Sequence, residues 1–240
     1  MTGQTGQDRW LYANLFHHWR KAGKVGTYVD LAAAWPRSHS NTWFFDRCLG
    51  WRGLCIEADP RKRELWTNPK EDGLKRSCHY EETCVSDSAK EVSFLSYTKG
   101  PSSLNSKVVE DSKKTSGHGD VTRIPCSRFD AVLRKHNITH IDFLSLDIES
   151  HEAEALRSLD FGAVTIDVII TETARNTPRV RPILERAGFR LLGEVGFDTV
   201  YLHERSAWHR HCTWDVGTTH LKGYNREDKH PRARCKEGMV

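Results

Sequence analysis

The chain has 240 residues, 38% of them hydrophobic, and a formal net charge of +4 at pH 7. This length fits one α/β domain with appendages, and no segment has the roughly 20 consecutive apolar residues of a membrane-spanning helix. The excess of cations lies in residues 205–240, which hold eight Lys and Arg against four Asp and Glu. We interpret this basic tail, which contains His and Trp, as a solvated terminus; nucleic acid, an anionic membrane or an acidic glycan are the partners it could contact.

The seven cysteines contain no CxxC pair and no zinc-binding spacing. Cys55 lies in an apolar run, where a reduced cysteine behaves as a small hydrophobic residue. The first ten residues lack the basic and apolar regions of a signal peptide. We therefore expect a soluble, cytoplasmic protein, unless the natural chain carries a secretion signal or an anchor. In a secreted protein, Cys78 or Cys84 could form a disulfide.

The first part of the chain alternates between helix and strand patterns. Residues 8–22 have apolar side chains at helical spacing and predict a covering helix within the N-terminal segment 1–25. Gly50 is placed to end a helix and Pro60 to begin one. After residue 25 we expect strands at 27–33, 53–58, 79–85 and 92–97. Helices are expected between them at 40–49 and 60–66.

Residues 98–120 are rich in Ser, Lys, Gly and Asp and have no periodicity, so they predict a polar loop that is either a substrate lid or disordered. The elements after it are predicted as strand 121–124, helix 127–136, strand 142–146, helix 150–159, strand 165–171, helix 178–187, and strands 190–192 and 199–203. This alternation predicts an α/β domain over residues 1–204, with a mostly parallel sheet, helices on both faces and a closing antiparallel hairpin.

Five acidic residues lie at or near the ends of predicted strands: Asp30, Glu57, Asp87, Asp147 and Glu172. The carboxyl ends of parallel strands meet at one edge, so we expect these residues to line one crevice, where α/β proteins bind ligands. Glu57 is placed to accept both hydroxyls of a ribose. The acidic edge, without GxGxxG or GxxxxGK[ST], disfavours dinucleotides and ATP. Taken singly, each carboxylate could instead be a helix cap or a solvated turn residue.

Several segments resemble the FkbM-type methyltransferases, which use S-adenosylmethionine (SAM) and generally methylate hydroxyl oxygens. They are VDLAA at 29–33, SNT at 40–42, CLGWRGLCIEADP at 48–60, IDFLSLDIESHEAEAL at 141–156 and GFDTVYLHE at 196–204. The resemblance implies a Rossmann-like class I methyltransferase fold with a seven-stranded sheet. Ala32 and Pro36 occupy the first turn, where the family usually has glycines.

The resemblance and the chemistry of SAM together assign a cofactor site. Asp30 would organise the first turn and reach the methionine end, Glu57 would hold the ribose, and Asp87, beside Ser86, would accept from the adenine amine. The complete predicted set is Asp30, Ala32, Ala33, Ser40, Asn41, Thr42, Glu57, Ala58, Asp59, Ser86, Asp87 and Asp147.

The candidate catalytic residues are Asp147, Glu149 and His151, together with Glu172 after the next strand. In-line methyl transfer requires positioning and removal of a hydroxyl proton, and histidine is a suitable base near neutral pH. The alternative is a plain helix start whose acidic residues interact with the helix dipole. Asp147, Glu149 and Glu172 could also hold Mg²⁺, which would bind the substrate hydroxyl and lower its pKa.

We therefore predict methyl transfer from SAM to a hydroxyl oxygen of a small acceptor, such as a sugar or a natural product. The alternative is a catalytically inactive module, altered at Ala32 and Pro36, that binds a glycan or nucleic acid through its basic tail. The core lacks an aromatic and basic nucleic-acid-binding pattern, which disfavours RNA as the acceptor. The sequence leaves the acceptor and the oligomeric state open.

Overall fold

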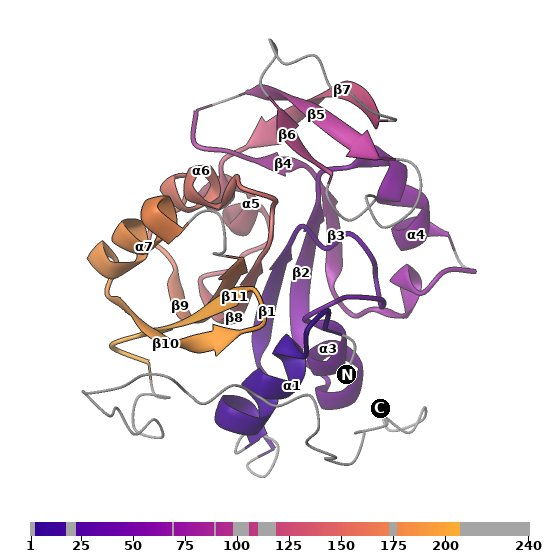
Figure 1. The fold of residues 1–240 in the computed structure, drawn as a ribbon. Coiled ribbons are helices and arrows are strands. Elements are labelled where there is room, and N and C mark those ends of the chain that lie inside the picture. The colour runs from indigo at the N-terminus through magenta and orange to yellow at the C-terminus, as the bar shows by residue number, and fades with distance from the viewer. Residues whose placement is uncertain are drawn as a thin grey trace.

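The computed structural model describes residues 3–17, 23–68, 70–88, 90–97, 106–109, 119–172 and 177–206 (Figure 1). The basic tail, apart from its first two residues, and most of the segment 98–120 lie outside these ranges, so their assigned roles stay predictions. In the described part of the chain, no helix is long and apolar enough to cross a membrane.

The main sheet has seven strands in the order β10-β11-β9-β8-β1-β2-β3. Five of them are parallel: β1 (Thr27–Leu31), β2 (Arg52–Glu57), β3 (His79–Glu82), β8 (His140–Leu146) and β9 (Thr165–Glu172). The antiparallel pair β10 (Phe189–Val195) and β11 (Asp198–His203) closes the sheet beside β9. This arrangement confirms the predicted mostly parallel sheet with a C-terminal hairpin.

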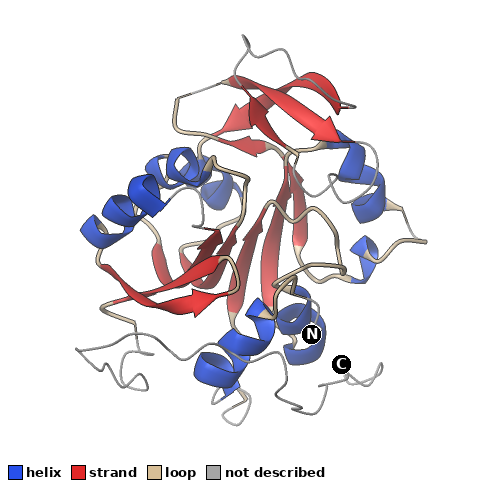
Figure 2. Ribbon diagram, in the orientation of Figure 1, coloured by secondary structure: helices blue, strands red, loops and turns tan. Residues whose placement is uncertain are grey.

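Helices cover both faces of this sheet (Figure 2). The helices α5 (Phe129–Lys135), α6 (Glu152–Arg157) and α7 (Thr177–Arg186) pack on one hydrophobic cluster. A second cluster holds α1 (Gln7–Leu11), the π-helical turn Tyr12–Phe16, α3 (Trp43–Leu49) and α4 (Arg63–Thr67). Side chains alternate between the faces of a strand, so Phe143 and Leu144 of β8 belong to different clusters.

The N-terminal cover and the helix after Pro60 differ in detail from the predicted elements. The cover is described as α1 and the π-helical turn, and residues 18–22 lie outside the described ranges. Pro60 begins a short 3-10 helix, Pro60–Lys62, that continues into α4, and a further 3-10 turn spans Gly73–Lys75. Gly50 ends α3 with φ 69°, as its predicted role requires.

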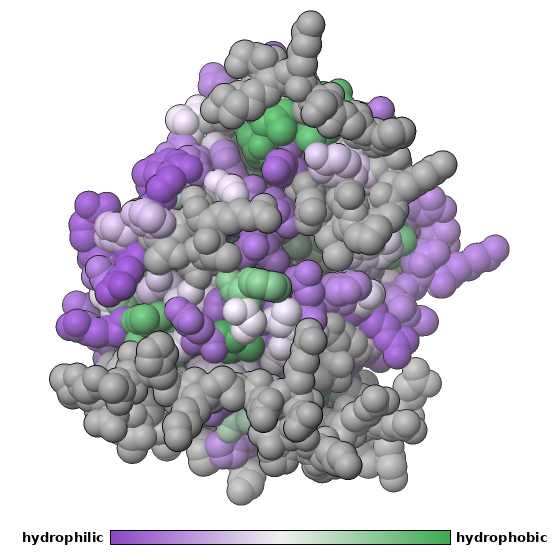
Figure 3. All heavy atoms as spheres, in the orientation of Figure 1, coloured by the Kyte–Doolittle hydropathy of each residue, from purple (hydrophilic) through white to green (hydrophobic). Residues whose placement is uncertain are grey.

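A second sheet, which the sequence did not predict, has the order β4-β7-β5-β6. Its strands are β4 (Cys84–Val85), β5 (Glu91–Tyr97), β6 (Lys107–Val109) and β7 (Gly119–Ser127). The expected strand 79–85 is thus divided, and β6 lies inside the expected polar loop. Figure 1 draws this small sheet beyond the upper ends of β2 and β3, and Figure 3 shows a group of hydrophobic residues over it.

Two disulfides correct the expectation that Cys55 is a reduced core residue. Cys55 of β2 is bonded to Cys78, and Cys84 of β4 is bonded to Cys126 of β7. Cys84 lies directly opposite Cys126 in the register of β4 and β7. Strand pairing between distant segments brings these cysteines together, so their spacing along the chain could not reveal the pairs.

Candidate active site

The first turn after β1 has the backbone shape of a glycine turn without the glycines. Ala32 and Ala34 have φ of 73° and 20°, in the region that favours glycine. The amides of Ala32 and Ala33 both donate to the Ile56 carbonyl of β2 at 2.9 Å. Pro36 is buried and is not among the residues that line the cavity described below. Its ring therefore leaves the cavity open.

We expect Ala32→Gly to raise the free energy of unfolding by about 0.5–1 kcal/mol, because relief of the left-handed conformation outweighs the added chain entropy. The matched control is Ala33→Gly, at a position without positive φ, which should lower stability by a similar amount. Urea denaturation of both variants checks this. A loss of stability in Ala32→Gly would contradict a strained turn.

A cavity lies between the carboxyl ends of the parallel strands and the small sheet, and it encloses about 1100 Å³ including its opening. Phe94 and Val108 of the small sheet contribute to its wall. The predicted site residues that line it are Asp30, Ala32, Ala33, Ser40, Asn41, Glu57, Ala58, Asp59, Asp147, Glu149 and His151. The structure places Thr42, Ser86, Asp87 and Glu172 outside this lining.

Glu57, at the end of β2, is a buried carboxylate that faces the first turn. It is 5% exposed, and its two oxygens accept from the amides of Ala34 and Asp59 at 2.7 Å each. Burial raises the pKa of Glu57 to about 7, although these amides act in the opposite direction. Each carboxylate oxygen has a second lone pair, so Glu57 retains acceptor capacity for ligand hydroxyls.

Asp30 lines the cavity, and Thr42 outside the cavity lining fixes its orientation. Its carboxylate accepts from the Thr42 hydroxyl, so Thr42 orients Asp30 rather than facing the cavity. Burial raises the pKa of Asp30, and the Arg76 guanidinium opposes this shift.

Arg76 is the residue of this region that sequence reasoning missed. Its side chain is fully buried and donates to Asp46 of α3 at 3.1 Å. It also donates to the Pro36 carbonyl at 2.6 Å and to the side chains of Ser40, Thr42 and Tyr28. Arg76 therefore fixes the first turn to α3 and β1. It lies in a polar segment without periodicity, and no pattern in the sequence indicated its burial.

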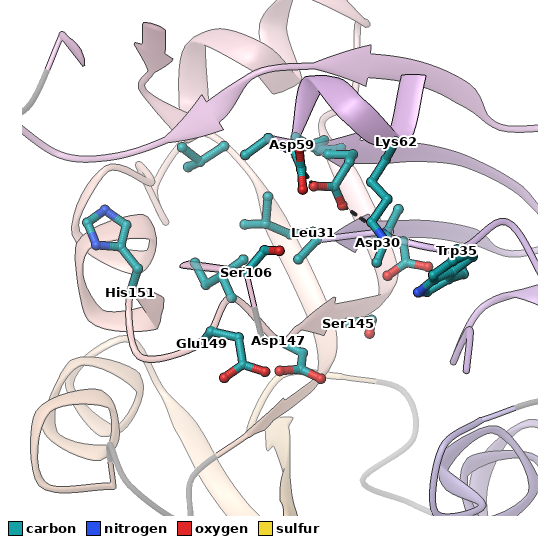
Figure 4. Close-up of a pocket in the computed structure, with 18 of the residues that line it drawn as sticks. Asp30, Leu31, Trp35, Asp59, Lys62, Ser106, Ser145, Asp147, Glu149 and His151 are labelled. Atoms are coloured by element: carbon teal, nitrogen blue, oxygen red, sulfur yellow. Dashed lines mark hydrogen bonds between the residues drawn. The ribbon is translucent and has the colours of Figure 1, made fainter. Parts of the chain in front are cut away.

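Carboxylates concentrate where β8, β9 and β11 meet. Burial, followed by the charges of Asp198, Glu172 and Glu149, raises the pKa of Asp147 well above its ordinary value. In Figure 4, Asp147 and Glu149 lie next to each other at the cavity. Glu149 and Ser150 both have positive φ, 53° and 80°, in the turn that presents these groups.

The acidic group compatible with a metal differs from the predicted one. Asp147, Glu152 and Glu172 offer ligand atoms within 4.8 Å of one another, whereas Glu149 does not belong to this group. Glu152 is fully buried and accepts from the amides of Ile148 and Ser150. The magnesium hypothesis stays a prediction, with Glu152 in the place given to Glu149.

His151 precedes α6 and lines the cavity. Its Nε2 lies 3.3 Å from the Ser86 hydroxyl, and its Nδ1 lies 3.8 Å from a carboxylate oxygen of Glu154. Burial lowers the pKa of His151, with the carboxylates of Glu154 and Glu152 opposing the shift. The imidazole is therefore neutral near pH 7 and can accept a proton.

Asp87 and Ser86 are engaged with other protein groups. The Asp87 carboxylate accepts from Arg157 Nε at 2.6 Å. Ser86 is 2% exposed and contacts His151. Their assignment to the adenine amine stays a prediction that nothing in these contacts tests.

The cavity has the acceptor groups that SAM requires. The Asn41 side chain lines it and donates through Nδ2 to Ser145, while its buried Oδ1 finds no hydrogen-bond partner among the residues that the structure describes. An unsatisfied buried acceptor fits a ligand with N–H donors, such as the ammonium group of SAM. Glu57 and Asp147 add negative charge to the same cavity, which suits a ribose diol and a sulfonium. The residues present thus fit the cofactor.

Comparison with known proteins identifies the family of this chain. Residues 24–191 match the Methyltransferase FkbM domain. One similar solved structure is the precorrin-6y C5,15-methyltransferase of Geobacter metallireducens GS-15, with a TM-score of 0.39 and 9% identity, covering 77% of this chain and 85% of that chain. No curated protein sequence matches significantly. The domain match covers most of the chain, and this protein therefore belongs to the FkbM methyltransferase family.

Proposed function

We propose that this protein is a SAM-dependent O-methyltransferase that acts on a small hydroxylated acceptor, a sugar or a natural product. Family membership supports methyl transfer in general. The observation that carries the more specific proposal is the cavity itself, which is lined by carboxylates at the strand ends and by the neutral imidazole of His151. The cavity therefore contains hydrogen-bond acceptors for the ribose and for the cationic end of SAM. It also contains a base for the hydroxyl of the acceptor.

In this proposal SAM, when bound, supplies an electrophilic methyl group. Glu57 accepts from the ribose hydroxyls, and Asn41 Oδ1 accepts from the ammonium group. Asp147 and Glu149 orient the acceptor hydroxyl beside the cavity wall. His151 accepts the proton of the acceptor hydroxyl at its Nε2 atom. In the structure this nitrogen lies beside the Ser86 hydroxyl. Positioning and proton removal are the two tasks that methyl transfer leaves to the protein.

Binding tests this proposal directly. We expect calorimetric titration to show micromolar binding of SAM and of S-adenosylhomocysteine, and no binding of ATP or NAD. Glu57→Gln should weaken SAM binding by roughly 1–3 kcal/mol, about 5- to 150-fold, through loss of charge-assisted hydrogen bonds. Glu64→Gln, on the exposed side of α4, is the matched control. Unchanged affinity in Glu57→Gln would remove Glu57 from the site.

The same carboxyl gives the binding a pH dependence. Because the pKa of Glu57 is about 7, its contribution to SAM affinity should grow as the pH rises through 7 and vanish in Glu57→Gln. In the protein without ligand the sign is opposite: a folded-state pKa raised from 4.5 makes the free energy of unfolding fall as the pH rises from 4.5 to about 7.

The alternative of an inactive binding module rests on the basic tail, which from residue 207 onward lies outside the described residues. Ala32 and Pro36, which suggested it, leave the cavity open. Absence of SAM binding to the wild-type protein would restore this alternative.

The disulfides bear on where the enzyme works. Disulfides form and persist mainly in oxidising compartments. We therefore propose the secretory alternative rather than the cytoplasm, supported by the pairs Cys55–Cys78 and Cys84–Cys126.

A further inference from the structure

One corner of the cavity contains two hydrogen-bond donors that have no recorded acceptor among the described residues. Lys62 is 8% exposed, lines the cavity, and holds its Nζ 3.8 Å from the centre of the Trp35 ring. Trp35, in the first turn, also lines the cavity, and its buried Nε1 has no hydrogen-bond partner in the described part of the chain. Figure 4 shows both side chains on one side of the cavity and His151 on the other.

The nearest carboxylates are already occupied by other donors. The two oxygens of Glu57 accept from backbone amides, and those of Asp59 accept from the Arg61 guanidinium at 3.1 Å each. Among the described residues, no carboxylate oxygen forms an ion pair with Lys62. The cation–π contact with Trp35 involves the charge of the Lys62 ammonium, but it provides no hydrogen-bond acceptor for the three N–H groups.

The Lys62 side chain is mostly buried, its ammonium has no carboxylate ion pair among the described residues, and it lines the cavity, which together point to a ligand. Burial lowers the pKa of Lys62, and the charges of Glu57 and Asp59 oppose the shift. Lys62 is the only lysine or arginine among the described residues lining the cavity. An anionic oxygen group at this corner would accept from both Lys62 and Trp35, with hydrogen bonds to a charged donor.

The opposite character of the other wall limits what this ligand can be. Lys62 supplies a cation at the Trp35–Lys62 corner, beside Glu57 and Asp59, whereas the end of β8 presents only the carboxylates Asp147 and Glu149. This separation fits a ligand that carries an anion and a cation at different atoms. SAM has a carboxylate as well as its sulfonium and ammonium groups.

We propose that Trp35 and Lys62 form an anion-binding subsite of the cavity, which takes the carboxylate at the amino-acid end of SAM. The assignment to SAM rests on the proposed function. A phosphate on the acceptor has the same chemistry and is the other source of such an anion. Neither Trp35 nor Lys62 belongs to the cofactor residues predicted from the sequence.

Three probes separate these sources in calorimetric titrations of the full chain: S-adenosylhomocysteine, 5′-methylthioadenosine, which lacks the amino-acid end, and inorganic phosphate. Lys62→Met should weaken binding of S-adenosylhomocysteine about 10- to 100-fold, because a charge-assisted hydrogen bond is lost, and change that of methylthioadenosine less than about two-fold. Arg63→Met removes a neighbouring cation whose side chain is 63% exposed, and should change neither.

A second variant keeps the test decisive if Lys62→Met unfolds. Trp35→Phe retains the ring beneath the ammonium and removes only the indole N–H, so we expect a several-fold loss for S-adenosylhomocysteine alone. Thermal melts of every variant establish that it is folded.

The outcomes are distinct. If Lys62→Met spares both nucleosides but abolishes phosphate binding shown by the wild type, the subsite stands and its anion comes from the acceptor. Equal weakening of both nucleosides, or no change with any probe, overturns the subsite. If the wild type binds neither nucleoside, the proposed function fails, and the phosphate titration alone decides the subsite.

Discussion

Replacement of His151 by alanine should lower kcat by about 10²- to 10⁴-fold while leaving SAM affinity nearly unchanged, the range expected for loss of a general base. His151 lines the cavity, and burial lowers its pKa, which favours the neutral imidazole that a general base requires near pH 7. The wild-type kcat should fall as the pH decreases and the imidazole becomes protonated, and the variant should lose that limb of the profile. Steady-state kinetics across pH, with calorimetry for SAM, separates the two effects.

A matched histidine exists for comparison. His136, at the end of α5, pairs with Glu81 and does not line the cavity, so His136→Ala should retain turnover. Full activity in His151→Ala would leave His151 structural. Asp147, whose raised pKa brings a carboxyl towards the range of a base, would then be tested as Asp147→Asn.

Replacement of Arg76 by methionine should cost about 3–5 kcal/mol of the free energy of unfolding, the usual result of removing one member of a buried ion pair. Asp46, whose side chain is also fully buried, would keep an uncompensated charge. The Pro36 carbonyl, Ser40 and Thr42 would lose their donor, so SAM affinity should fall together with stability. Urea denaturation and calorimetry measure both quantities.

Two further variants distinguish the loss of the Arg76–Asp46 ion pair from a nonspecific loss of stability. Lys75→Met removes the adjacent cation, which is 58% exposed, and should change stability by less than about 0.5 kcal/mol. Asp46→Asn combined with Arg76→Met removes the stranded charge and should recover part of the loss. A cost below about 1 kcal/mol in Arg76→Met would show that the buried guanidinium does not hold the turn.

The main sheet and the edge of the sheet at which the cavity lies could both be predicted from the sequence. The strands of the parallel sheet and the helices that cover it are predicted from local sequence: apolar runs indicate the strands, Gly50 marks the end of a helix and Pro60 marks the start of one. The acidic residues at strand ends followed from the same pattern, because parallel strands share one carboxyl edge. Asp30, Glu57 and Asp147 reach the cavity for this reason. The pattern of residues alone predicted a ribose-containing ligand. The resemblance to the family was needed to predict that this ligand is SAM.

Contacts between groups that are far apart along the chain could not be predicted from the sequence. The pairs Cys55–Cys78 and Cys84–Cys126, the buried contact of Arg76 with Asp46, and the approach of Lys62 to Trp35 all join segments that lack periodicity or are far apart along the chain. The small sheet shares this origin, since β5 and β7 pair across the segment 98–118. Local propensity does not encode such contacts, because their energies arise from burial and pairing after the chain has folded.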